Sequence, residues 1–146
     1  MKVTIKELPT NWRDQYDNIG NSQEGKARAS KGGKYGMVDS SNGTVLVPFE
    51  YDYIGDFQEG KAWAEKGDKY GMVDSSNGNI LVPFEYDWIG YSQEGKARAR
   101  KGGKYGMVDS LNGTVLVPFE YDYIGNSQEG KAWAEKDGKE FEISFN

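Results

Sequence analysis

The sequence contains no cysteine and no histidine. This excludes thiol nucleophiles, Ser–His and Cys–His arrangements, disulfides and the usual zinc ligand sets. Carboxylates remain the only candidates for acid–base catalysis, but they recur along the chain in the same local context. A catalytic pair needs two carboxylates in different environments. We therefore expect a protein that is not an enzyme, with no catalytic residue, no metal site and no cofactor.

Positive charge and long apolar runs are also scarce. The 18 Lys and Arg residues are outnumbered by 23 Asp and Glu residues, giving a net charge of -5. Without a basic tract, the chain is not expected to bind nucleic acid. No run approaches the ~20 apolar residues of a membrane span, and lysines interrupt residues 1–8, where a signal peptide would be apolar. We expect a cytoplasmic protein with no membrane partner.

What the sequence does contain is a repeat of 35 residues. Gly25, Gly60, Gly95 and Gly130 lie 35 positions apart. Residues 16–50, 51–85 and 86–120 are three complete copies, 121–146 begin a fourth, and 1–15 lie outside the pattern. Such a period is typical of stacked or closed arrays, in which one unit cannot bury its apolar surface alone. The whole chain, 1–146, is predicted to be a single repeat domain.

Each copy is predicted to be a three-stranded antiparallel meander. The 20 glycines and the 14% aromatic content favour an all-β fold with many turns. Gly32-Gly33 and Asn42-Gly43 are typical of two-residue hairpin loops, which places strands at about 26–31, 34–40 and 44–50. The alternation of side chains then gives each sheet two apolar faces, one for each neighbouring copy.

The ends of the chain predict how the array is closed. The fourth copy has no third strand, and residues 2–8 form an extra strand-like segment without a partner. We expect this N-terminal strand to complete the last blade of a closed, four-blade, propeller-like ring, which would hide the sheet edges. The alternative is an open β-solenoid with capped ends.

The repeat resembles the bacterial WG-repeat, or KWG-repeat, family. The resemblance rests on Phe57-Gln-Glu-Gly-Lys-Ala, Lys69-Tyr-Gly-Met-Val-Asp, Asn77-Gly and Ile80-Leu-Val-Pro-Phe-Glu-Tyr-Asp, and it covers about residues 16–139. Tyr35, Tyr70 and Tyr105 stand where the family has its name-giving Trp. The resemblance implies a bacterial origin, a propeller-like β-architecture and a role in interaction, and it supplies no catalytic residues.

Candidate binding residues are found where the copies differ. One position alternates between Arg and Trp, and a position in the connector between copies is mostly aromatic. These positions, together with one tyrosine found only in the third copy, give the candidates Arg28, Trp63, Arg98, Trp133, Tyr53, Trp88, Tyr123 and Tyr91. They have two interpretations. Arg and Trp of successive copies could stack on each other, and the connector rings could cover the core; alternatively, both sets could contact a partner.

The favoured function is a non-enzymatic module for protein–protein interaction, because a repeated surface binds with avidity. One narrower version is an inhibitor or immunity protein. The alternative is a carbohydrate-binding module in which the connector rings stack on sugars. The near identity of the copies is also compatible with a designed or idealised repeat protein that has no natural ligand.

Overall fold

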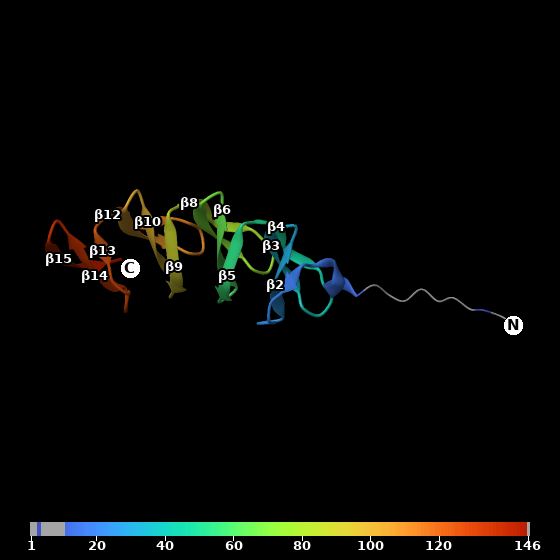
Figure 1. The fold of residues 1–146 in the computed structure, drawn as a ribbon. Coiled ribbons are helices and arrows are strands. Elements are labelled where there is room, and N and C mark those ends of the chain that lie inside the picture. The colour runs from blue at the N-terminus through green and yellow to red at the C-terminus, as the bar shows by residue number, and fades with distance from the viewer. Residues whose placement is uncertain (1–2, 4–10, 146) are drawn as a thin grey trace.

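The protein is an open row of four antiparallel β-sheets, which follow one another along the chain from the N-terminal to the C-terminal end (Figure 1). This is a computed structural model, and it describes residues 3 and 11–145. In this part of the chain, no helix is long and apolar enough to cross a membrane. The all-β prediction is confirmed.

A short 3-10 helix precedes the sheets, and every strand contains two to seven residues. The helix is η1 (Trp12–Gln15), and the first sheet contains β1 (Asn18–Ile19), β2 (Lys26–Lys31), β3 (Lys34–Asp39) and β4 (Val45–Tyr51). The second contains β5 (Tyr53–Gln58), β6 (Lys61–Lys66), β7 (Lys69–Asp74) and β8 (Ile80–Tyr86). The third contains β9 (Trp88–Gln93), β10 (Lys96–Lys101), β11 (Lys104–Asp109) and β12 (Val115–Tyr121). The last contains β13 (Tyr123–Ile124), β14 (Lys131–Lys136) and β15 (Lys139–Ser144).

The prediction of three strands per copy is wrong by one strand. The connector between copies is itself a strand and pairs with the next copy's first predicted strand, as when Tyr53 pairs with Glu65 and Ile54 with Ala64. The complete sheets are therefore four-stranded meanders, like propeller blades. The connector can pair because Asp52 is the only residue between β4 and β5, so the chain enters the next sheet directly.

The two hairpin loops differ. The Gly32-Gly33 loop has two residues, as predicted, and Lys31 pairs with Lys34. The Asn42-Gly43 loop is longer: the N–H of Asp39 donates to the carbonyl of Thr44. Val38 then pairs with Val45, and Met37 with Val47. The predicted two-residue loop is wrong because the Asp39 side chain accepts from the N–H of Ser41 and widens the turn.

The core lies between the sheets. Between the first two sheets, Met37, Val47 and Tyr51 pack on Ile54, Phe57, Ala62, Ala64 and Val73. Equivalent clusters join the second sheet to the third and the third to the fourth. In each of the first three sheets, a glycine of the third strand leaves room for an aromatic ring of the fourth strand. A Cβ on Gly36, for example, would lie 2.9 Å from the ring of Phe49. The prediction that both faces of a sheet contribute to packing between copies is confirmed.

The two ends are different, and no ring closes among the described residues. The first and last sheets lie at opposite ends of the row (Figure 1). At the first sheet, Trp12 lies against Gly43, where the preceding sheet's strand would otherwise pack. Closure of the ring is therefore not confirmed. The N-terminal strand predicted at residues 2–8 lies largely outside the described residues.

Candidate binding surface

Two chains of aromatic rings run along the row of sheets, and they contain most of the predicted binding residues. The first chain links Tyr35, Tyr53, Trp63 and Tyr70, with successive ring centroids 5.1, 5.7 and 5.4 Å apart. The second links Trp88, Tyr105, Tyr123 and Trp133, with centroids 6.2, 5.3 and 5.8 Å apart. We call these eight residues the aromatic ladder.

The ladder is partly open to solvent. The exposed fractions of Tyr53, Tyr123 and Trp133 are 37%, 40% and 42%, while the other rings are half-buried. Trp88 is among the half-buried rings, and Tyr105 packs on it in an edge-to-face arrangement. Burial raises the pKa of Tyr70, as does the neighbouring Glu65. The ladder therefore consists of rings that are held by their neighbours and still present part of their surface.

The two predicted arginines pack on the ladder, but in a different way from the predicted stack. The Arg28 guanidinium lies 5.3 Å from the ring centroid of Tyr53, and its Nη1 donates to the carbonyl of Ile54 at 2.9 Å. Arg98 lies 5.8 Å from the ring of Trp88 and donates to the carbonyl of Ile124 at 2.8 Å. Each arginine thus hydrogen-bonds the next sheet's first strand. Of the two interpretations, the stacking of Arg on the Trp of the next copy is not found among the described residues, and the arginines pack on the connector rings Tyr53 and Trp88 instead.

Tyr91 does not join the ladder. It is 64% exposed and lies with Arg98 and Asn126 at the rim of a small hollow between the third and fourth sheets. Tyr35, Tyr70 and Tyr105 belong to the ladder but were not among the predicted binding residues. The sequence does contain a signal for these tyrosines, because the alternation of side chains along strands places Tyr35 on the same sheet face as Arg28.

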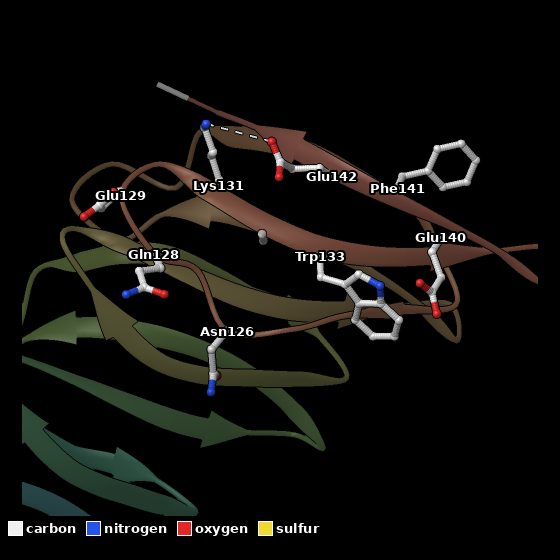
Figure 2. A pocket seen from close by; sticks show the side chains of 9 residues that line it. Asn126, Gln128, Glu129, Lys131, Trp133, Glu140, Phe141 and Glu142 are labelled. Atoms are coloured by element: carbon white, nitrogen blue, oxygen red, sulfur yellow. Dashed lines mark ion pairs between the residues drawn. The ribbon is translucent and has the colours of Figure 1, made fainter.

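A wider hollow, of about 590 Å³, lies at the C-terminal end of the ladder. Figure 2 shows Trp133 and Glu140 side by side on one wall, with Asn126 and Gln128 on the loop before β14. Lys131 and Glu142 form an exposed ion pair at 3.9 Å on the opposite rim. The hollow combines one exposed indole ring with amide and carboxylate groups, which suits a ligand with an apolar face and several hydroxyl or ammonium groups.

The recurring aspartates stabilise hairpin turns and link neighbouring sheets. Asp52 Oδ2 accepts from the N–H of Gly67 in the hairpin of its own sheet, and Oδ1 accepts from Lys34 Nζ of the preceding sheet. These hydrogen bonds lower the pKa of the Asp52 carboxyl, and the same arrangement lowers the pKa of Asp87 and Asp122. Among the described residues, no group of three or more acidic side chains could hold a metal ion.

No curated protein matches the sequence. The N-terminal domain of Nup159 is similar in structure, with 10% identity and a TM-score of 0.45 over 95% of this chain and 48% of that one, so the chain spans about half of that structure. A symmetrical protein described as a product of de novo evolutionary emergence has 11% identity and a TM-score of 0.37, over 90% and 70% of the two chains. A lectin from Cicer arietinum has 15% identity and a TM-score of 0.33, over 88% and 87%.

The family assignment comes from the repeat itself. The model of the WG containing repeat matches four consecutive stretches, residues 15–35, 35–70, 70–105 and 105–139. Each stretch ends at or beside the Lys-Tyr-Gly position that brings Tyr35, Tyr70 and Tyr105 into the ladder. The sequence resemblance is therefore confirmed, and the chain belongs to the WG-repeat family.

Proposed function

We propose that the protein is a non-enzymatic, cytoplasmic interaction module that binds a protein partner along the aromatic ladder. The observation that carries this proposal is a series of partly exposed rings that are fixed by their own packing. Tyr and Trp are the side chains most favoured at the energetic centres of interfaces, and rings that are already ordered lose little conformational entropy on binding. An inhibitor or immunity protein is the narrower form of the same proposal.

Repetition supports the same proposal. Tyr53 and Tyr123 occupy the same position in different sheets and have nearly equal exposure, 37% and 40%. A partner with two equivalent binding segments can engage both, and the second contact then benefits from a high effective concentration. The net charge of -5 favours a partner with a basic surface.

The test is affinity capture from a cell lysate with three baits. The first bait is the intact protein, and the second carries Tyr53→Ala, Tyr123→Ala and Trp133→Ala. The third is a matched control in which equally exposed apolar residues away from the ladder are replaced, Val45→Ala, Ile80→Ala and Val115→Ala; these are 51%, 58% and 50% exposed. The expected result is a partner that the intact and control baits retain and the ladder variant loses.

Calorimetry with the purified partner then measures how much each set of substitutions weakens binding. Three central aromatic side chains at more than about 1 kcal/mol each should weaken binding by at least ~100-fold, while the control should change it by less than about threefold. Equal loss in the ladder and control variants would contradict the proposal. Circular dichroism of all three baits verifies that each is folded.

Carbohydrate binding is the second candidate, and the hollow at Trp133 favours it. An exposed indole ring beside amide and carboxylate groups can stack on a sugar and accept hydrogen bonds from its hydroxyls. Titration with oligosaccharides at millimolar concentration should quench the tryptophan fluorescence, and Trp133→Phe should reduce the change. If neither a protein nor a sugar binds, the interpretation as an idealised repeat protein without a natural ligand is favoured.

A further inference from the structure

The last sheet has one strand fewer than the other three. In the third sheet, β11 pairs with β10 on one side and with β12 on the other. The equivalent strand of the last sheet, β15, pairs with β14, and no second partner occurs among residues 11–145. Such an edge presents unpaired N–H and C=O groups and is a template for a further strand.

The side chains of β15 determine which side-chain pattern a further strand needs in order to pair with it. Phe141 and Ile143 pair with Ala134 and Ala132, which belong to the core, so these two side chains are on the inner face. Phe141 is nevertheless 44% exposed. Glu140 and Glu142 alternate with them and are exposed on the outer face. The matching strand therefore has apolar side chains on one face and positive charges on the other.

Residues 2–6 of the chain, Lys-Val-Thr-Ile-Lys, have this pattern. Val3 and Ile5 fall on one face of an extended segment, and Lys2 and Lys6 fall on the other. Val3 is described by the structure and is 75% exposed. We propose that residues 2–8 of one molecule add to β15 of a second molecule as its fourth strand, with Val3 and Ile5 beside Phe141 and the lysines beside Glu140 and Glu142.

The acceptor must be another molecule because the continuously described chain begins at residue 11, beside the first sheet, whereas β15 lies at the opposite end of the row (Figure 1). Packed sheets are about 10 Å apart, so the first and fourth sheets are separated by roughly 30 Å. Three residue steps join residue 8 to residue 11, where the described chain resumes, and they reach at most about 11 Å. Donor and acceptor are thus at opposite ends of each molecule, and head-to-tail addition produces open chains of variable length.

Sedimentation velocity at increasing protein concentration is the test. The intact protein should show an average mass that rises above 16.3 kDa and falls again at high salt. Reversing the donor charges with Lys2→Glu/Lys6→Glu, or the acceptor charges with Glu140→Lys/Glu142→Lys, should weaken self-association roughly tenfold or more. The protein carrying all four substitutions should recover to within about threefold of the intact protein, because both partners are then reversed.

Three results would overturn the proposal: an intact protein that stays monomeric to about millimolar concentration, double variants that associate as the intact protein does, or no recovery in the fourfold variant. A second measurement separates addition to another molecule from addition within one molecule. Because the sequence has no cysteine, Val3→Cys and Phe141→Cys proteins can be mixed and oxidised. A Val3–Phe141 cross-linked heterodimer is expected, whereas a Val45→Cys protein in place of Phe141→Cys should give none above background.

Discussion

Gly55 and Gly125 occupy the same position in two copies but lie at very different distances from the ladder tryptophan of their sheet. A Cβ built on Gly55 would lie 2.0 Å from Cε2 of Trp63, whereas the nearest atom to a Cβ on Gly125 is Cε3 of Trp133, at 3.5 Å. The first distance is a severe clash and the second is an ordinary contact. The difference agrees with the environment of the two indoles, since Trp63 is half-buried and Trp133 is 42% exposed.

Gly55→Ala should therefore destabilise the protein by about 1–3 kcal/mol, because the added methyl group has to displace Trp63 from between Tyr53 and Tyr70. Gly125→Ala is the matched control and should change the free energy of unfolding by less than about 0.5 kcal/mol. Urea denaturation followed by circular dichroism measures both, and a shift in tryptophan emission should accompany only the first. Equal effects in the two variants would show that the ladder does not pack on these glycines.

At the scale of the strand and turn, the sequence predicted those elements that backbone geometry alone determines. The strand Lys26–Lys31 and its Gly-Gly hairpin are as expected, since Gly32 and Gly33 have φ of 61° and 80°. The Asn-Gly loop was mispredicted because a side chain, that of Asp39, caps the turn and lengthens it. The connector strand was missed because Tyr53–Gln58 pairs with its neighbour through an irregular register, so strict alternation is lost.

The turn that joins each connector strand to the next strand contains an unfavourable residue in all four copies. Glu24, Glu59, Glu94 and Glu129 have φ between 52° and 54°, and a glycine with positive φ follows each. Two consecutive positive φ values define a type I′ turn, whose first position favours Asn over Glu. Each Glu→Asn substitution should therefore stabilise the protein by about 0.5 kcal/mol, and the four together by about 2 kcal/mol.

Thermal and urea denaturation of the single Glu59→Asn and the fourfold variants check this expectation. Glu140→Asn is the control, because Glu140 is exposed on β15 and is not among the residues with positive φ. The control should give no stabilisation, since Asn is disfavoured in strands. A fourfold variant that is no more stable than the control would mean that the turns relax without strain in the intact protein.

At the scale of the whole molecule, the sequence predicted the repeat and the two-faced packing, but it did not decide how the ends are arranged. The row and the ring share the same local contacts within and between neighbouring sheets, and the ends alone distinguish them. The binding surface was predicted in part for a related reason. The variable positions identified Tyr53, Tyr123 and Trp133, whereas Tyr35 recurs unchanged in the three complete copies and gives no contrast between them.

The outer face of the last sheet carries charged residues where the equivalent faces of the other sheets are apolar. The buried methionine of each inter-sheet cluster, Met37, Met72 and Met107, has Glu142 as its equivalent in the fourth copy, one period of 35 residues beyond Met107. Glu140 likewise replaces the ladder tyrosine. A charged face cannot be covered by the apolar face of another sheet without a large desolvation penalty. Terminal repeats of stacked arrays have polar outer faces for this reason.

A glutamate at the equivalent position inside the row should divide the row into two units that unfold separately. Met72 is 3% exposed between the second and third sheets, so Met72→Glu would bury a carboxylate among Val82, Tyr86 and Ile89. We expect a loss of at least about 3 kcal/mol and the replacement of one unfolding transition by two, because the row then behaves as two pairs of sheets with a weak junction. Met72→Leu conserves volume and should lose less than about 1.5 kcal/mol with a single transition. Calorimetry distinguishes these outcomes, and a single transition in the Met72→Glu protein at nearly unchanged stability would mean that the sheets are not held together by these clusters.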